Sequence, residues 1–188
     1  MESLRIAEYP VTYGIIAINI LIFILLNTGK LDVSRLGSSY INSLQEKQYY
    51  RIVTAAFTQK EFLHLLCNMY SLYNIGRTLE HVLESWLFAV CYAVIMLCGG
   101  FMSARIHKKI SPFTLCIGAS GVICGLLGIY MVIAFSVRGF SGLKSMIPTM
   151  VLLALMTTSR KIDSIGHFAG LLVGIICGIV MVSVYSFG

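Results

Sequence analysis

Charge is scarce in this sequence. Charged residues make up 12% of its 188 residues, whereas an ordinary soluble domain carries about 25%. Hydrophobic residues reach 57% and the mean hydropathy is +0.85. Such a chain would be insoluble as a water-facing globule, so the composition excludes that class and indicates a membrane protein.

Acidic residues are the scarcest charged type. Eight Asp and Glu stand against fourteen Lys and Arg, which gives a net charge of +6. The basic residues lie in short loops between apolar runs, a pattern that favours lipid headgroups over nucleic acid as the partner. The sequence also shows no internal repeat, low-complexity tract or linker, so we expect one domain over residues 1–188.

Two further signals are missing. The first apolar stretch has no clear small-residue cleavage site and is followed by more spans, so we expect it to be part of the fold rather than a signal peptide. The cysteines show no metal-ligand spacing, and we interpret them as small buried hydrophobic residues. They are Cys67, Cys91, Cys98, Cys116, Cys124 and Cys177.

The apolar runs predict an all-α, polytopic membrane protein with six transmembrane helices. A span needs about 20 apolar residues, which places helices at about 10–28, 62–83, 85–106, 118–137, 144–158 and 166–187. The fifth is short. The second carries several polar residues, which are costly in lipid unless they face protein or water and therefore suggest a functional site. The 33-residue loop before it is long enough to have structure or function of its own.

Three polar motifs stand at the starts of even-numbered helices: His64 with Asn68, Ser120 within GASG, and His167 within GHFAG. In an alternating bundle all even-numbered helices begin on the same side of the membrane. Counting helices therefore predicts that these groups lie at a similar depth, opposite the N-terminus.

Glycines indicate how two of these helices could meet. Small residues at four-residue spacing let helix backbones approach closely in lipid. If the two stripes face each other, Ser120 and His167 come together; generic helix packing is the alternative. The stripes are Gly121, Gly125 and Gly128 in one helix, and Gly166, Gly170, Gly174 and Gly178 in the other.

These residue types suit acyl transfer. A serine hydroxyl needs a base to become a good nucleophile, and a histidine is suited to that role. The backbone N–H of Ser120 and the side chains of His64 and Asn68 could donate to an oxyanion. Asp163 more plausibly belongs to the loop or the helix cap, so we expect a Ser120–His167 dyad that needs no metal or organic cofactor.

Together these motifs resemble the rhomboid family of intramembrane serine proteases, over nearly the whole chain. The HxxxN pattern is His64–Asn68, the GxSG motif runs from Gly118 to Gly121, and the last-helix motif runs from Gly166 to Gly170. Arg51 after Tyr50 resembles the family's Trp-Arg pair in the first loop. Glu80 resembles its buried glutamate near the end of the second helix.

The resemblance implies a six-helix core whose long first loop lies partly in the membrane. It implies membrane-anchored protein substrates that enter laterally, past the fifth helix and the loop before the fourth. It also implies a cytoplasmic N-terminus. The charge count disagrees with this orientation. Ten Lys and Arg lie on the active-site side and four on the other, which by the positive-inside rule favours the reverse orientation.

The two indications of orientation conflict, and we keep the cytoplasmic N-terminus of the resemblance, with the cell membrane as the expected location. The residues counted on the active-site side are Lys30, Arg35, Lys47, Arg51, Lys60, Arg105, Lys108, Lys109, Arg160 and Lys161; those on the N-terminal side are Arg5, Arg77, Arg138 and Lys144. We expect Arg51 and its neighbours to pack into protein, so these residues should count less in the positive-inside comparison.

One position departs from the resemblance. Some family members have an aromatic residue four positions after the serine, where it stacks on the catalytic histidine. This sequence has Cys124 there, which is too small to stack. Either another group holds His167 or it is held less firmly, and we expect a somewhat lower activity without a change of reaction.

Each motif taken alone has a simpler interpretation. Ser120 could be a helix cap, His64 and Asn68 could bridge helices, and Arg77 could pair with Glu80 for stability. His107, Lys108 and Lys109 are typical of a solvated loop near the headgroups. Two other classes stay open: a rhomboid-like protein that binds membrane segments without cutting them, and a small transporter or channel. Neither would react with a serine-directed fluorophosphonate.

Overall fold

The computed structural model describes residues 8–151 and 163–185. Over these residues the chain is helical, and its only β-type pairing is an isolated bridge between Ser38 and Cys116. The all-α prediction is therefore confirmed. The elements are α1 (Pro10–Asn27), α2 (Val33–Leu36), η2 (Tyr40–Gln45), α3 (Tyr50–Ala56), α4 (Phe62–Val94), η3 (Ile95–Gly99), α5 (Gly100–Ile110), α6 (Ser120–Arg138), η4 (Gly139–Met146) and α8 (Ser164–Val184).

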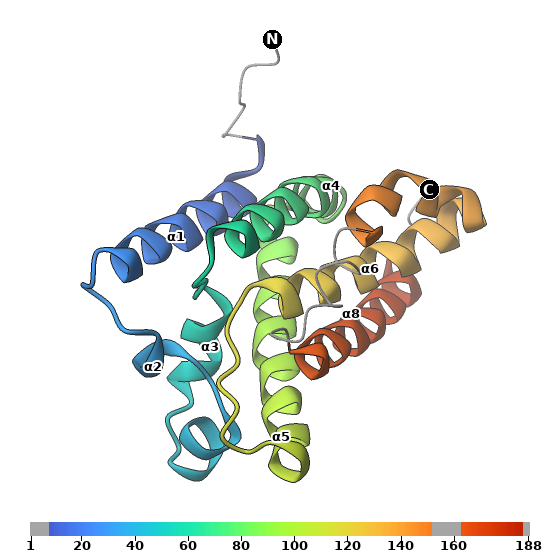
Figure 1. The fold of residues 1–188 in the computed structure, drawn as a ribbon. Coiled ribbons are helices and arrows are strands. Elements are labelled where there is room, and N and C mark those ends of the chain that lie inside the picture. Colours follow the sequence, from blue (N-terminus) through green and yellow to red (C-terminus); the bar gives the residue numbers. More distant parts are fainter. Residues whose placement is uncertain (1–7, 152–162, 186–188) are drawn as a thin grey trace.

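Four helical stretches among the described residues are long and apolar enough to cross a membrane. They are Pro10–Asn27, Phe62–Ile110, Ser120–Lys144 and Ser164–Val184. The second has 49 residues and would measure about 74 Å if straight, more than twice a hydrocarbon core. It turns sharply instead at Glu84, whose φ of 62° is not helical (Figure 1).

The predicted helices can be compared with these bounds. The predictions 62–83 and 85–106 lie on either side of Glu84, and the second of these helices continues through the π-turn η3 to Ile110. The predicted helix 118–137 corresponds to α6, and 166–187 corresponds to α8. The predicted fifth helix, 144–158, is described only as far as residue 151, and its remainder lies outside the described residues.

Helices α6 and α8 form the most extensive contact in the described bundle and run side by side in Figure 1. The two glycine stripes face each other there: a Cβ added at Gly170 would collide with the carbonyl oxygen of Gly121, and one at Gly174 with that of Gly125. Backbone contact of this kind replaces the hydrophobic force that lipid does not supply.

Helix α1 is joined to α4 by buried polar groups. The Glu80 carboxylate accepts hydrogen bonds from the backbone N–H groups of Val11 (3.0 Å) and Thr12 (2.8 Å) at the start of α1. These N–H groups have no partner within their own helix, so Glu80 caps α1 from the neighbouring helix. Arg77 instead contacts the rings of Tyr9 and Tyr73. The expected Arg77–Glu80 pair is therefore absent from the described contacts.

The long connection between α1 and α4 contains α2, η2 and α3. Arg51, in the first turn of α3, donates from Nη1 to the carbonyl oxygens of Ser34 (2.6 Å) and Gly37 (3.2 Å) at the end of α2. This contact fixes the fold of the loop. Tyr50 beside it is exposed, which suits a residue at the membrane interface.

Candidate active site

Ser120 is the first residue of α6, and the backbone just before it has an unusual conformation. Gly118 has a φ of 120°, a region that L side chains rarely adopt. Its N–H donates to the carbonyl oxygen of Ala55 at 2.9 Å, which fixes the loop against α3. The GASG sequence thus turns an extended loop into a helix and leaves the first N–H groups of α6 without partners in the helix.

His167 lies in the first turn of α8, directly across from Ser120. Its Nε2 atom is 2.7 Å from Ser120 Oγ, a hydrogen bond between side chains 47 residues apart in sequence. Both residues are buried, with exposed fractions of 7% and 5%. The glycine stripes bring the two helices close enough for this contact, as the sequence-based interpretation required.

The supporting glycines lie where the two helices begin. A Cβ at Gly121 would lie 3.2 Å from the carbonyl oxygen of Gly166, and a Cβ at Gly166 would lie 2.6 Å from Oδ2 of Asp163. A larger residue at Gly121 would separate the helices at the level of the dyad, and one at Gly166 would displace the Asp163 cap of α8.

His64 lies beside this pair. A Cβ at Gly118 would be 3.0 Å from His64 Cε1 and 3.6 Å from Ser120 Oγ, so the missing side chain leaves room between the imidazole and the hydroxyl. His64 Nε2 is buried and makes no hydrogen bond within the described part of the chain. Burying an unpaired polar atom costs free energy. Such an atom beside a serine is a candidate to donate a hydrogen bond to a bound ligand.

Asn68 lies one helical turn after His64 and is almost fully buried. Its Nδ2 donates to Gln59 Oε1 at 2.8 Å, and Gln59 Nε2 donates in turn to Asn19 Oδ1 at 3.2 Å. One of the two amide hydrogens of Asn68 is therefore committed to this network. The network joins α4 to α1 through the loop that precedes α4.

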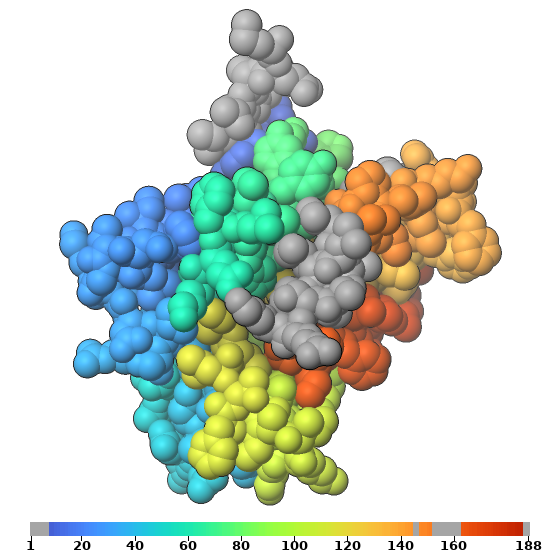
Figure 2. Space-filling view, in the orientation of Figure 1, coloured from blue at the N-terminus to red at the C-terminus, as the bar shows by residue number. Residues whose placement is uncertain are grey.

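Ser120, His167 and His64 line one cavity of about 810 Å³. Its wall comes from α3, α4, α5, α6, α8 and the loop residues Ser38 and Ser39. In Figure 2 the loop that precedes α6, in yellow, lies at the surface between the start of α4 and the end of α5 (Figure 2). A cavity lined by polar groups can hold the water that hydrolysis requires.

Asp163 does not join the dyad. It is the N-cap of α8, as the sequence predicted, and its Oδ1 accepts from the backbone N–H of Ile165. The same oxygen lies 2.9 Å from His107 Nε2. Burial opposes ionisation of this carboxyl, but hydrogen bonds from Cys116 and His107 hold its pKa below the usual value.

The prediction for His107 is wrong. The two lysines of the predicted solvated loop, Lys108 and Lys109, are exposed, but His107 is buried and pairs with Asp163. Sequence reasoning also missed Gln59, which is fully buried in the polar network. No sequence signal marks these partners, because each pairs with a distant segment.

Cys124 lies one turn after Ser120 and is buried in the core of the described bundle. Cys116 differs from the other cysteines in its surroundings, because it lies among polar side chains on the cavity wall. The general interpretation of the cysteines as buried hydrophobic residues is confirmed for Cys91 and Cys124, but it is wrong for Cys98, which is exposed, and for Cys116.

A family model described as Rhomboid domain matches residues 46–184. The match begins within the long first loop and ends at the last residue of α8, so it includes the dyad, the glycine stripes and the His64–Asn68 turn.

Curated proteins with similar sequences have names that refer to rhomboid proteins. RHOMBOID-like protein 5 of Arabidopsis thaliana is 26% identical over 152 residues, which cover 78% of this chain and 48% of the relative. Rhomboid protease GluP of Bacillus subtilis is 28% identical over 172 residues, 87% of this chain and 33% of the relative. Rhomboid-like protease 3 of Toxoplasma gondii is 25% identical over 148 residues, covering 74% and 54%. The chain therefore spans about half the length, or less, of these relatives.

Proposed function

Because the matched Rhomboid domain spans most of its length, this chain belongs to the rhomboid family, and we propose that it is an intramembrane serine endopeptidase. It is an integral, multi-pass membrane protein. The observation that carries the proposal is the 2.7 Å contact between Ser120 Oγ and His167 Nε2, on the wall of a cavity between membrane-length helices.

In the proposed reaction, His167 Nε2 accepts the proton of the Ser120 hydroxyl as Oγ attacks the carbonyl carbon of a peptide bond. The carbonyl oxygen becomes an oxyanion. His167 then gives the proton to the leaving amine, which breaks the C–N bond and leaves an acyl-enzyme. Water, deprotonated by the same imidazole, releases the acid and restores Ser120.

The oxyanion needs donors placed in advance. We assign this role to the Ser120 backbone N–H and to His64 Nε2, in the tautomer that carries its proton there. Asn68 contributes the amide hydrogen that is not donated to Gln59. Gly118, Gly121, Gly166 and Gly170 support the site by close approach, while Arg51 and Glu80 support it by fixing the first loop and the start of α1.

The proposed substrates are membrane-anchored proteins cut in or near a transmembrane segment. A helix hides its carbonyl carbons behind backbone hydrogen bonds, so the cleaved segment has to unwind locally. Helix-breaking residues near the cleavage site should therefore speed cleavage. Equal rates across a Gly-Pro scan of a cleaved segment would contradict this requirement.

The test compares the purified full chain with Ser120→Ala and His167→Ala, using a single-span model substrate, gels and mass spectrometry. We expect cleavage by the unmodified chain alone, together with fluorophosphonate labelling at Ser120. If neither cleavage nor labelling occurs across several substrates, a non-catalytic binder of membrane segments becomes the better assignment. Equal cleavage by Ser120→Ala would exclude Ser120 as the nucleophile.

We further propose that the N-terminus is cytoplasmic and that the active site opens toward the opposite side of the cell membrane. The charge count favours the reverse orientation. A reporter fused to the C-terminus distinguishes the two, because an even number of spans returns the C-terminus to the N-terminal side. A signal from the outer compartment would overturn our orientation.

A further inference from the structure

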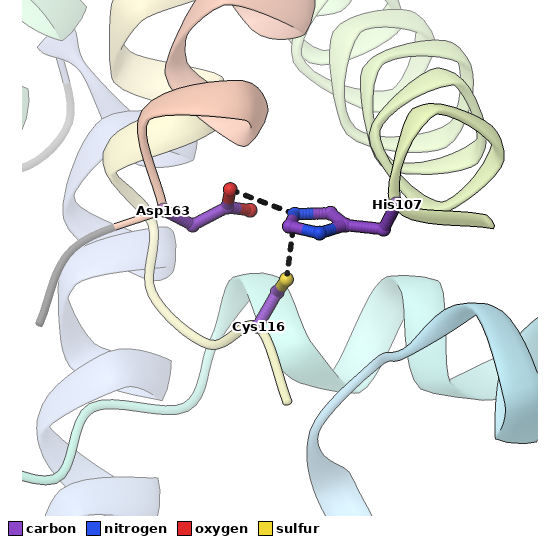
Figure 3. Close-up of side chains that lie close together, drawn as sticks. All are labelled: His107, Cys116 and Asp163. Carbon is purple, nitrogen blue, oxygen red and sulfur yellow. Dashed lines mark hydrogen bonds and ion pairs between the residues drawn. The ribbon is translucent and has the colours of Figure 1, made fainter. Parts of the chain in front are cut away.

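Three side chains with metal-binding atoms meet on the cavity wall, apart from the dyad. His107 lies in the last turn of α5, Cys116 in the loop before α6, and Asp163 at the cap of α8 (Figure 3). One nitrogen, one sulfur and one carboxylate oxygen of these residues all lie within 4.8 Å of one another. All three residues line the cavity.

Two of the three ligand distances can be compared with those around a tetrahedral metal ion. With Zn²⁺–ligand bonds of about 2.0–2.3 Å, a nitrogen and a sulfur ligand lie about 3.6 Å apart, and a nitrogen and an oxygen ligand about 3.4 Å apart. His107 Nε2 is 3.6 Å from Cys116 Sγ and 2.9 Å from Asp163 Oδ1. The nitrogen–sulfur distance already matches, and the nitrogen–oxygen distance has to open by only about 0.5 Å.

The atoms behind these ligands are also arranged as in a metal site. The other ring nitrogen of His107 is 2.7 Å from Ser111 Oγ, and the other carboxylate oxygen of Asp163 accepts from Ser103 Oγ at 3.3 Å. Outer partners of this kind orient ligands and select the histidine tautomer. His107 and Asp163 therefore each keep one atom for the ion while another atom is held in place.

The backbone holds the three ligands in position as well. Cys116 is paired with Ser38 through two backbone hydrogen bonds, of 2.7 and 3.1 Å. Asp163 is fixed as a helix cap. His107 belongs to a regular helix. Little reorganisation is needed to bring the ligands together.

We propose that His107 Nε2, Cys116 Sγ and Asp163 Oδ1 form a binding site for Zn²⁺, with the fourth ligand position facing the cavity. Nitrogen and thiolate ligands suit Zn²⁺, whereas Mg²⁺ and Ca²⁺ prefer oxygen. Binding forms a Zn–S bond and releases the thiol proton of Cys116 to solvent. This site is separate from the proposed peptide chemistry, which needs no metal.

The alternative is a structural latch, in which the His107–Asp163 ion pair simply holds the end of α5 against α8. The latch uses two of the three proposed ligand atoms, and it differs from the metal site in its need for Cys116. A latch needs no thiolate, whereas a metal site requires Cys116 to lose its proton. A metal-bound Cys116 thiolate therefore distinguishes the metal site from the latch.

The experiment titrates the purified, chelator-treated full chain with Co²⁺ and then displaces it with Zn²⁺. We expect one ion per chain, a thiolate-to-cobalt charge-transfer band and the visible absorption of tetrahedral cobalt. Cys116→Ser should abolish the charge-transfer band, and Ser111→Ala should weaken binding about tenfold. Ser120→Ala and Cys98→Ser should leave both signals unchanged, because neither residue belongs to the cluster.

Absence of a thiolate band in the unmodified chain, or a band that survives in Cys116→Ser, would overturn the proposal. Loss of the band in Ser120→Ala would also overturn the assigned ligand set, because Ser120 does not belong to it. A second measurement needs no variant: Zn²⁺ should slow alkylation of Cys116 by about tenfold or more and leave exposed Cys98 unaffected. Equal rates for Cys116 with and without Zn²⁺ would also reject the site. None of these readouts depends on peptidase activity.

Discussion

Two pairs of helices in the described bundle are held together in opposite ways. Helices α6 and α8 meet backbone to backbone, with glycines of each helix against carbonyl oxygens of the other. Helix α1 meets α4 through buried hydrogen bonds from Glu80 and through the Asn19–Gln59–Asn68 network. Lipid supplies little force between helices, so close packing and polar contacts are the two means available.

The proposed chemistry divides along the same line. The nucleophile and the base come from the pair packed by glycines, where hard atomic contacts fix their separation. The proposed side-chain donors His64 and Asn68 come from α4, which directional hydrogen bonds orient. The close packing of glycines fixes the distance between Ser120 Oγ and His167 Nε2. Hydrogen bonds to polar partners orient the proposed donors beside them. Changes to each pair should therefore have different consequences.

The largest expected effect comes from removing the nucleophile. Ser120→Ala should lower the cleavage rate by about 10³-fold or more, and the Ser120→Ala/His167→Ala double variant should lose no more than the single variant, because the two residues act as one unit. Cleavage rates of the single and double variants check this. Ser136→Ala, on the same helix, is the control. Additive losses would mean that the two residues do not act together.

His64→Ala should have the next largest effect. Removing one oxyanion donor costs about 10²- to 10³-fold in the rate of the chemical step, and the stability of the chain should change little, since Nε2 has no partner among the described residues. Single-turnover cleavage and thermal unfolding in detergent measure the two quantities. His81→Ala, on the same helix, is the matched control. A stability loss without a rate loss would make His64 a packing residue.

The glycine-packed pair was predictable because its signal is local. A four-residue repeat of glycines is visible within each helix, and the motifs around Ser120 and His167 stand at the ends of those repeats. Helix counting then placed both residues on one side. The break at Glu84 also agrees with the gap between two predicted spans, because a helical stretch of 49 residues is too long for one span.

The polar contacts were less predictable because each joins segments that are distant in sequence. His107 and Asp163 are 56 residues apart, and Gln59 reaches Asn19 across 40 residues. A single polar residue near an apolar run is not part of a repeating pattern, so the sequence does not indicate which residue it contacts. His107 was therefore assigned to solvent beside two lysines that are indeed exposed. The prediction for the partner of Glu80 is likewise wrong, because a helix start provides backbone N–H donors that no side chain reveals.

Gly170→Ala tests the packed pair directly. The added Cβ would collide with the Gly121 carbonyl oxygen, and overpacking of this kind costs about 1–3 kcal/mol of stability. The separation of Ser120 and His167 should grow, so cleavage should fall as well. Chemical unfolding in mixed micelles and cleavage rates provide the measurements. Gly14→Ala is the control, because a Cβ there meets nothing within 4 Å; equal effects at both positions would remove the distinction between the pairs.

Glu80→Gln tests the polar pair and should have the smallest effect. The amide replaces one acceptor oxygen by a donor, so the N–H of Val11 or Thr12 loses its partner, at a cost of about 1–2 kcal/mol. The same unfolding measurement detects this loss, and Glu46→Gln on the exposed loop is the control. The dyad lies on the other pair and keeps its geometry, so we expect the cleavage rate of the folded protein to stay close to that of the unmodified chain. A rate loss as large as that of Gly170→Ala would show that the two helix pairs are mechanically coupled, and that shape alone does not set the distance between Ser120 and His167.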